Sequence, residues 1–431
     1  MRHYLLILYF AVVIQKTGIE AFIALAGHYP VLDVRSPGEY AHAHIPGVYN
    51  LPLFSDEERK VVGTAYKQEG REQAIKIGLD YFGGKMRKMV EDAEEISKRH
   101  RPFKSVQSRG AITDSVKLFN YSKGNTQNEM LADSDLTTFQ KLSNLSSDTL
   151  NINEHARAWN NATDSTIMNQ PKGSVLVHCW RGGMRSAGVA WLLDLYGFKV
   201  YTLVGGYKAF RNWALQQFEK QYPFKIIGGY TGSGKTPVLK ELAEKGNTII
   251  DLEGIAHHKG SAFGDLGEPR QPAPEMFENK LAMELYRAGD SGEIWLEDES
   301  RRIGDLNLPA SFWNAMRNAP VFFIEVPFEE RLKHIVEEYG KFKKEDLVSA
   351  IKRIQKRLGG QNAKNAINYI NEDNITQAFR ILLAYYDKHY SKGLAERDHL
   401  NELLTVIPCT HVDPERNSLL ISAKYRIDNG Q

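Results

Sequence analysis

A short glycine-rich segment in the middle of the chain constrains the fold more than any other feature. It runs from residue 229 to 236 with the sequence GYTGSGKT, after an apolar run at 224–227 and before a helical pattern that Pro237 opens. Strand, glycine-rich turn and helix in this order are typical of a phosphate-binding loop in a parallel α/β sheet. Backbone N–H groups of such a loop surround phosphates, and its lysine neutralises them. The predicted phosphate-binding residues are Gly229, Gly232, Ser233, Gly234, Lys235 and Thr236.

A second glycine-rich turn surrounds Cys179 and also lies between a predicted strand, 175–178, and a predicted helix, 186–196. Backbone N–H groups at the start of a helix, with Arg181 and Arg185 nearby, favour the thiolate form of a cysteine. We therefore predict that Cys179 is a nucleophile and that Arg181 and Arg185 complete a catalytic group. A histidine-cysteine pair with Arg-Ser beyond it also occurs in cysteine phosphatases, so the loop alone does not separate sulfur transfer from phosphate hydrolysis.

Acidic residues follow two apolar runs of the second half of the chain. Asp251 ends one run, and Asp298 and Glu299 end another. These three are candidate accessory acids, and Thr236 would reach a magnesium ion if one binds. The pair His257 and His258 has no cysteine beside it, which favours a loop that faces the substrate over a metal site. The sequence predicts no metal centre.

The chain length and the pattern of strands and helices predict two domains. At 431 residues the chain exceeds one ordinary core. We assign residues 15–218 to the first domain and 222–431 to the second, with a polar, flexible insertion at about 104–170 and a helical region from 329 to about 402. Residues 403–407 and 419–421 are expected to form a late strand pair. The apolar run at 4–14 is too short to span a membrane and is expected to be a buried strand or helix.

Charge and cysteine content restrict the compartment and the partners. A net charge of +2 is too small to indicate a nucleic-acid partner, so RNA contacts would need local clusters such as 85–88, 98–101 and 352–357. Only two cysteines, Cys179 and Cys409, are present. This number cannot build a disulfide framework, which favours a reducing compartment and a cytoplasmic location.

Three segments outside the Cys179 loop resemble parts of the rhodanese family. Residues 32–40, LDVRSPGEY, and 44–47, HIPG, are similar to its opening, and residues 203–209, LVGGYKA, are similar to its end. The resemblance implies a rhodanese fold in which the cysteine accepts sulfur. Six residues from Cys179 to Met184 before Arg185 favour sulfur transfer over phosphatase chemistry. Asp33 and Arg35 are expected to be a structural pair.

The order of the motifs, together with the segment LEGIAHH at 252–258, resembles the tRNA 2-selenouridine synthase family. The resemblance implies an α/β protein, with an N-terminal rhodanese-like domain followed by a P-loop NTPase-like parallel-sheet domain and a helical C-terminal region. It implies exchange of sulfur for selenium in 2-thiouridine at the tRNA wobble position, through a geranylated intermediate. Arg181 and Arg185 would hold the anionic selenium donor.

The substrates implied by this resemblance are tRNA, selenophosphate supplied by selenophosphate synthetase, and geranyl diphosphate bound by the loop at Lys235. Magnesium would be an optional partner, and neither a tightly bound cofactor nor a membrane is expected. Two alternatives stay open at this point. One is a cysteine phosphatase or thiosulfate sulfurtransferase fused to a small-molecule kinase-like domain, and the other is an RNA-binding protein without catalytic activity.

Overall fold

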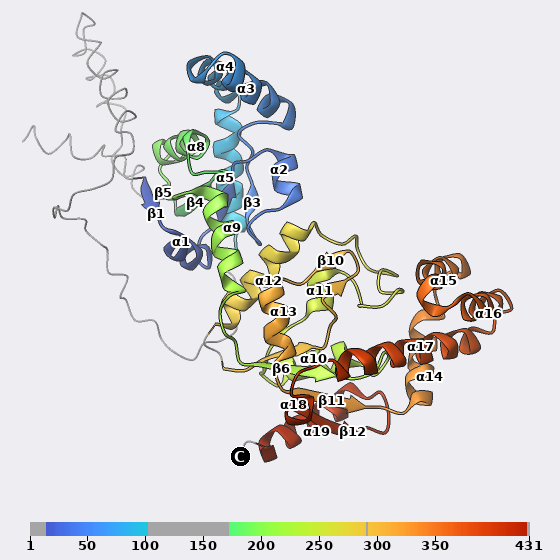
Figure 1. The fold of residues 1–431 in the computed structure, drawn as a ribbon. Helices are drawn as coiled ribbons and strands as arrows, with labels where there is room; N and C mark the ends of the chain where they lie inside the picture. Colours follow the sequence, from blue (N-terminus) through green and yellow to red (C-terminus); the bar gives the residue numbers. More distant parts are fainter. Residues whose placement is uncertain (1–13, 102–171, 290–291, 429–431) are drawn as a thin grey trace, which may run out of the picture. The chain divides into compact units, whose positions relative to one another are not determined.

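The computed structural model describes residues 14–101, 172–289 and 292–428. Within these residues the chain forms two five-stranded parallel sheets, a short antiparallel hairpin and a helical C-terminal region (Figure 1). The predicted α/β class with parallel sheets is confirmed. The insertion expected at about 104–170 and most of the apolar run at 4–14 lie outside the described residues.

The first sheet has the strand order β1-β5-β4-β2-β3, and every pair in it is parallel. Its middle strand β4 is buried along most of its length because helices cover both faces. Its strands are β1 (Gln15–Thr17), β2 (Val31–Asp33), β3 (Tyr49–Asn50), β4 (Ser174–His178) and β5 (Lys199–Leu203). Its helices are α1 (Ile19–Ala26), α2 (Pro37–His42), α3 (Asp56–Gln68), α4 (Arg71–Gly83), α5 (Met86–Arg99), α8 (Met184–Leu195) and α9 (Gly206–Gln217).

The second sheet has the order β12-β11-β6-β8-β7 and is also parallel throughout. Its strands are β6 (Phe224–Gly228), β7 (Thr248–Ile250), β8 (Ile294–Glu297), β11 (Val321–Glu325) and β12 (Leu404–Pro408). The hairpin pairs β9 (Arg302–Ile303) with β10 (Leu306–Asn307). The helices of this part are α10 (Lys235–Glu244), α11 (Leu252–Ala256), α12 (Pro274–Ala288), α13 (Ala310–Arg317) and α19 (Pro414–Asp428).

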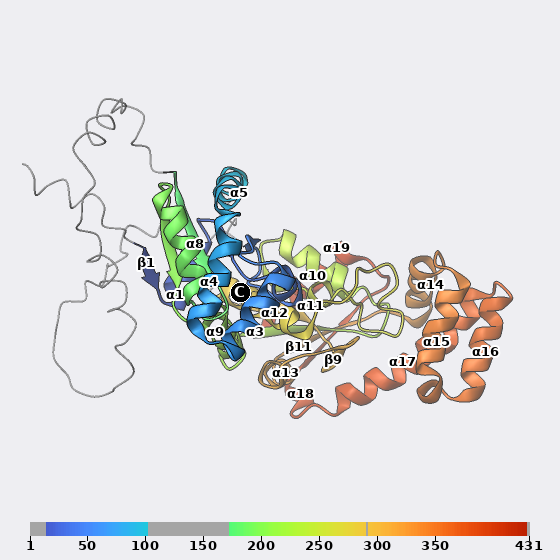
Figure 2. The ribbon, with the colours of Figure 1, turned by 90° about the horizontal axis from the view of Figure 1, so that it is seen from above.

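Four helices between β11 and β12 form a separate apolar cluster. They are α14 (Phe328–Tyr339), α15 (Lys344–Leu358), α16 (Gly360–Asn371) and α17 (Ile375–Ala395), and the short α18 (Leu400–Leu403) follows them. Leu347, Ile351 and Ile354 recur on one face of α15 and are buried, as expected for an amphipathic helix. Figure 2 shows α15 and α16 side by side at the end of this region.

Most predicted strands coincide with observed ones within one or two residues. Of the two strands predicted near the end of the chain, 403–407 is observed and 419–421 is not. Residues 403–407 correspond to β12, which pairs in parallel with β11. Residues 419–421 lie in α19 instead, where Ile421 is fully buried against the apolar cluster of Val238 and Leu239 on α10. A short apolar run does not distinguish a strand from the buried face of a helix. The proposed boundary near residue 220 stays a prediction.

Polar contacts join α9 to α12. The Tyr207 hydroxyl donates to Glu275 Oε1 at 2.8 Å and accepts from Asn279 Nδ2 at 2.7 Å. The same amide nitrogen of Asn279 also donates to the backbone oxygen of His44 at 2.9 Å. Asn279 is fully buried, so its hydrogen bonds are costly to lose.

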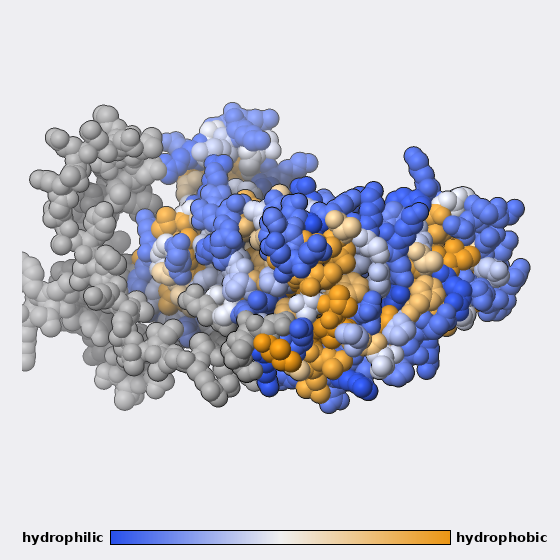
Figure 3. Space-filling model, turned by 60° about the horizontal axis from the view of Figure 1, so that its bottom comes forward, coloured by the Kyte–Doolittle hydropathy of each residue, from blue (hydrophilic) through white to orange (hydrophobic). Residues whose placement is uncertain are grey.

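The surface drawn in Figure 3 is largely hydrophilic, with apolar side chains gathered in patches on one part of this face. No helix in the described part of the chain has the length and apolar character that crossing a membrane requires.

Candidate functional site

Cys179 follows the last residue of β4, in a loop that ends at the first turn of α8. Two glycines allow this loop to close on its neighbours. A Cβ atom on Gly182 would lie 2.5 Å from the Leu203 oxygen, and one on Gly206 would lie 2.4 Å from the Cys179 oxygen. Both glycines have positive φ angles, 67° and 59°, which side chains disfavour. The backbone N–H of Tyr207 donates to the Cys179 oxygen at 2.8 Å.

The environment of the Cys179 thiol favours the thiolate. The side chain is 3% exposed, and its Sγ lies 3.3 Å from the Ser186 hydroxyl oxygen. Burial alone would raise the pKa of this thiol, but hydrogen bonds from Ser186 and the charge of Arg185 outweigh burial and lower the pKa. Cys409 is the opposite case, because burial raises its pKa to about 11.

The two arginines of the loop differ in their contacts. Arg185 Nη1 donates to Glu39 Oε2 at 2.9 Å, and Arg59 Nε contacts the same oxygen at 2.7 Å. Arg181 is exposed and contributes through its backbone N–H, which favours the Cys179 thiolate. The structure thus places Arg185 beside the thiol but partly neutralises it through Glu39. Their catalytic roles stay predictions.

Asp33 and Arg35 form the buried wall behind this loop, as expected for a structural pair. Arg35 is 1% exposed, and its Nη2 contacts Asp33 Oδ2 at 2.6 Å and the Ala43 oxygen at 2.8 Å. The guanidinium also lies 3.8 Å from the ring centre of Tyr207. Burial would raise the pKa of Asp33, but nearby His178 and Arg35 together lower it.

The glycine-rich loop that is predicted to bind phosphate lies between β6 and α10, and its ligand stays a prediction. Gly232 and Gly234 have φ angles of 78° and 81°. Lys235 Nζ donates to the Gly229 oxygen at 3.0 Å, so in the free loop the lysine is folded back on the loop itself. Ser233 Oγ is buried and has no hydrogen-bond partner within the described residues. A loop of this geometry can surround a diphosphate with N–H groups, Ser233 and Lys235.

Glu253 and Glu297 are functional candidates that the sequence analysis missed. The Thr236 hydroxyl donates to Glu253 Oε2 at 2.6 Å, and the Glu253 N–H donates to Glu297 Oε1 at 2.8 Å. The carboxyl groups of Glu253 and Glu299 are hydrogen-bonded to each other. Glu253 lies in α11, inside the segment 252–258 that served only for the family resemblance, and a hydrogen bond to Glu297 at the end of β8 holds it beside the loop.

The shared burial of these acids raises the pKa of each of them. Burial, reinforced by the charge of Glu253, raises the pKa of Glu297 to about 8. Burial also raises the pKa of Glu253 and, with the Glu253 charge, raises the pKa of Glu299 well above its usual range. Protonation reduces the repulsion that a diphosphate would otherwise meet beside Lys235.

The other two predicted acids have different surroundings. Asp251 caps α11 and accepts a hydrogen bond from the Gly254 N–H at 2.7 Å. Asp298 accepts from the Tyr390 hydroxyl at 2.7 Å and from Arg397 Nη2 at 2.6 Å. Of the three, only Glu299 joins the acids beside Thr236. Across the described ranges, no three His, Cys, Asp or Glu side chains are arranged to hold a metal ion.

Helix α17 supports the phosphate-binding loop from outside. The Gly229 N–H donates to the Tyr390 hydroxyl at 3.1 Å, and the Lys235 ammonium lies 5.7 Å from the centre of the Tyr390 ring. Arg331 Nη1 donates to the Thr231 oxygen at 3.0 Å and is held by Asp387 of α17 at 2.8 Å. Neither Tyr390 nor Arg331 carries a local motif that the sequence could reveal.

Two of the three predicted basic clusters are largely paired within their own helices. Arg87 contacts Glu91, Lys88 contacts Asp92 and Lys98 contacts Glu94, and all three pairs are exposed ion pairs four residues apart. In the third cluster, Arg353 and Arg357 line a cavity. The first two clusters are therefore weaker candidates for RNA contacts than the third.

The family model described as tRNA 2-selenouridine synthase AAA domain matches residues 222–403. A tRNA 2-selenouridine synthase of Sulfurovum sp. (strain NBC37-1) is 32% identical over 390 residues, which cover 84% of this chain and 86% of the relative. The tRNA 2-selenouridine synthase of Pseudomonas putida (strain W619) is 31% identical over a region that covers 77% of this chain and 76% of the relative. The tRNA 2-selenouridine synthase of Bdellovibrio bacteriovorus is 30% identical over a region that covers 87% of this chain and 91% of the relative.

Proposed function

This chain belongs to the tRNA 2-selenouridine synthase family, and on that premise we propose that it replaces the sulfur of 2-thiouridine at the wobble position of tRNA by selenium. The observation that carries the proposal is the combination, in one chain, of a cysteine loop that favours a thiolate and a predicted phosphate-binding loop beside buried acids whose pKa is raised. Each loop serves one half of the reaction. The expected location of this activity is the cytoplasm.

The first half of the proposed reaction is geranyl transfer at the loop of Lys235. The sulfur of 2-thiouridine attacks the first carbon of geranyl diphosphate, the carbon–oxygen bond breaks, and diphosphate leaves with the electron pair while the base loses its N3 proton. Loop N–H groups and Lys235 stabilise the negative charge that develops on the diphosphate. Lys235 must exchange the Gly229 oxygen for a phosphate oxygen. ATP hydrolysis has no part in this step.

The second half is the exchange of geranylated sulfur for selenium at the loop of Cys179. The selenium of selenophosphate attacks C2 of the base, geranylthiol leaves with a proton, and water cleaves the selenium–phosphorus bond to release phosphate. Alkylation makes the sulfur a good leaving group. Cys179 is essential here, and Arg181 and Arg185 hold the anionic donor, which selenophosphate synthetase supplies.

The test is mass spectrometry of tRNA nucleosides after incubation of the protein with thiouridine-containing tRNA, geranyl diphosphate and selenophosphate. We expect geranylthiouridine and selenouridine with the wild type, loss of both with Lys235→Ala, and accumulation of geranylthiouridine with Cys179→Ala. Each loss should exceed about a hundredfold, as for removal of a principal charge-stabilising group. Matched controls are Lys245→Ala, at the other end of α10, and Cys409→Ala. Unchanged nucleosides together with hydrolysis of an aryl phosphate would instead establish a phosphatase.

A further inference from the structure

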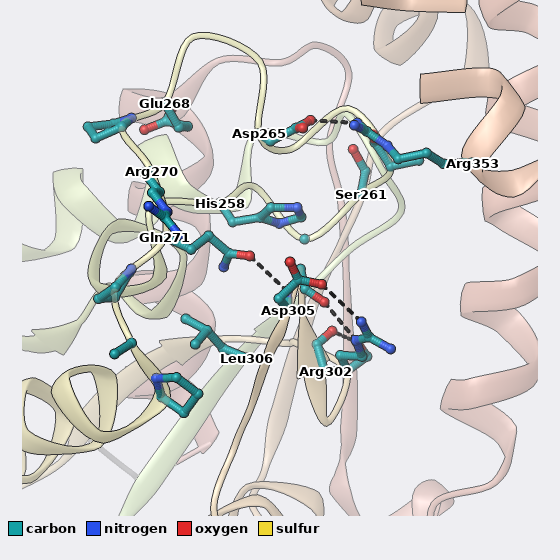
Figure 4. Close-up of a pocket in the computed structure, with 18 of the residues that line it drawn as sticks. His258, Ser261, Asp265, Glu268, Arg270, Gln271, Arg302, Asp305, Leu306 and Arg353 are labelled. Atoms are coloured by element: carbon teal, nitrogen blue, oxygen red, sulfur yellow. Dashed lines mark hydrogen bonds and ion pairs between the residues drawn. The ribbon is translucent and has the colours of Figure 1, made fainter. Parts of the chain in front are cut away.

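A cavity of about 1130 Å³ opens in the second half of the chain, outside both glycine-rich loops. It is bounded by the segment from His258 to Pro274, by the hairpin of β9 and β10, and by α15 (Figure 4). Ligand pockets for small molecules range up to roughly 1000 Å³. This cavity is therefore large enough for a nucleotide with its flanking phosphates.

Its lining carries more positive charge than its own acids neutralise. Arg302 pairs with Asp305 at 3.1 Å and Arg353 pairs with Asp265 at 2.7 Å. The third acid, Glu268, lies 3.8 Å from Lys259. Within the described residues, the remaining lining arginines, Arg270 and Arg357, make no side-chain hydrogen bond or ion pair. Arg270 stands on the segment that leads into α12 and Arg357 stands on α15, and two free guanidinium groups on one cavity are suited to an anion with more than one phosphate.

A polar group with no protein partner lies among these charges. His258 is 8% exposed, and its Nδ1 is buried with no hydrogen-bond partner in the described structure. Figure 4 shows its ring in the middle of the cavity, between Gln271 and Ser261. Gly264 and Gly304 leave room for the ring, because a Cβ atom on either would lie within 2.8 Å of it. Burial lowers the pKa of His258, so the neutral ring offers one donor and one acceptor.

The cavity shares a wall with the phosphate-binding site. Gly260 lines the cavity and packs against the Glu299 carboxylate, since a Cβ atom there would lie 2.8 Å from Glu299 Oε2. The backbone N–H of His258 donates to the backbone oxygen of Glu253 at 3.1 Å. Glu253 and Glu299 are the acids that surround Thr236 and Lys235. A base held in the cavity would therefore lie next to the phosphate-binding loop.

We propose that this cavity binds an unstacked nucleotide of the single-stranded RNA substrate, with Arg270 and Arg357 on its phosphates and His258 on the edge of its base. The assignment rests on the proposed function, which supplies an RNA whose wobble base must leave the anticodon stack to react. Sequence-specific RNA recognition commonly uses such unstacked bases, read through their edges and held by arginines. The four arginines among the lining residues disfavour an uncharged lipid at this place.

The test measures binding of an anticodon stem-loop RNA that carries 2-thiouridine, by fluorescence anisotropy over a range of salt concentrations. Each lost phosphate contact lowers the slope of log affinity against log salt by about one. We expect Arg270→Ala with Arg357→Ala to lower the slope by about two. The matched control, Arg380→Ala with Arg416→Ala, removes the same charge from α17 and α19 and should leave the slope unchanged. Equal slopes for the two double variants would overturn the proposal.

A second variant separates base recognition from charge. We expect His258→Phe to keep the wild-type salt slope but to lose about tenfold in affinity for the thiouridine RNA, because a buried partner for the base edge is removed. Loss of geranyl diphosphate binding with unchanged RNA binding in the arginine variants would assign the cavity to the small substrate and overturn the proposal. Binding assays involve no chemistry. If the wild type shows the expected RNA slopes but forms no selenouridine, the proposed function fails and the cavity assignment stands.

Discussion

The state of the Cys179 thiol is set by few contacts, and burial works against them. A buried thiol without partners has a raised pKa, as Cys409 shows. Cys179 is just as buried, yet its pKa is lowered because the hydroxyl and the backbone of Ser186 hydrogen-bond with the sulfur and Arg185 lies nearby. Since Arg185 is already paired with Glu39, the Ser186 hydroxyl is the contact whose removal is expected to change the pKa most directly.

We therefore predict that Ser186→Ala raises the pKa of Cys179. Its hydrogen bond stabilises only the thiolate, so without it a higher pH is needed for the same thiolate fraction. The rate of iodoacetamide alkylation, measured against pH in a Cys409→Ala background, should shift to a midpoint about one unit higher. Ser422→Ala, which removes a hydroxyl bonded only to the backbone of α19, is the control. An unshifted midpoint for Ser186→Ala would show that the backbone and Arg185 alone set the pKa.

Residues with a local signature could be predicted, and residues that reach the site over long sequence distances could not. Cys179 and Lys235 stand in glycine-rich turns between a strand and a helix, so spacing alone reveals them. Glu253 contacts Thr236 from a neighbouring helix, and Tyr390 reaches Gly229 across 161 residues. For the same reason the sequence could not choose between Asp298 and Glu299, which are adjacent on the chain but face different partners.

At the scale of elements, α17 connects the helical region to the phosphate-binding loop. Tyr390 is half-buried, and its hydroxyl accepts from the Gly229 N–H while donating to Asp298. Arg397, just beyond α17, is held by the other oxygen of Asp298 and has no exposed side-chain surface. The loop is thus positioned by a hydrogen-bond chain that ends in a buried ion pair. Within the described residues, Arg397 Nε and Nη1 have no hydrogen-bond partner, so this end of the chain depends on the bond from Nη2 to Asp298.

The corresponding prediction is that Tyr390→Phe raises the KM for geranyl diphosphate by about tenfold with a much smaller change in kcat. Phenylalanine fills the same space but leaves the Gly229 N–H and Asp298 without their partner, at a cost of about 1 to 3 kcal/mol. Steady-state kinetics of geranyl transfer provide the measurement. Tyr385→Phe, one turn earlier on α17, is the control because its hydroxyl is not part of this chain. Equal KM values for both variants would mean that the loop keeps its position without Tyr390.

The elements themselves were largely predictable where hydrophobic pattern and turn residues agree. The run before the Cys179 loop was identified as β4 and the run before the Lys235 loop as β6, because a glycine-rich turn follows each of them. The prediction at α19 was wrong. Its apolar residues are buried by α10, a tertiary contact that local pattern does not contain.

At the scale of the whole molecule, the two predicted steps belong to two different sheets. Cys179 follows β4 of the first sheet and the Lys235 loop follows β6 of the second, and both lie at the carboxyl ends of parallel strands, where ligands of α/β sheets bind. Each loop has its own supporting residues, Ser186 and Arg185 for one and Tyr390 and Glu253 for the other. Damage to one loop should therefore leave the chemistry of the other intact.

This independence predicts that two inactive variants complement each other in a mixture. Cys179→Ala should still geranylate thiouridine, and Lys235→Ala should still exchange the geranylated sulfur, so geranylated tRNA released by the first becomes substrate for the second. We expect selenouridine to appear in the mixture, measured by nucleoside mass spectrometry, although neither variant forms it alone. A mixture of Cys179→Ala with Cys179→Ala/Lys235→Ala is the control and should form none. If Lys235→Ala converts purified geranylated tRNA but the mixture stays inactive, the intermediate does not leave the protein. If Lys235→Ala fails to convert it, the two loops share one site.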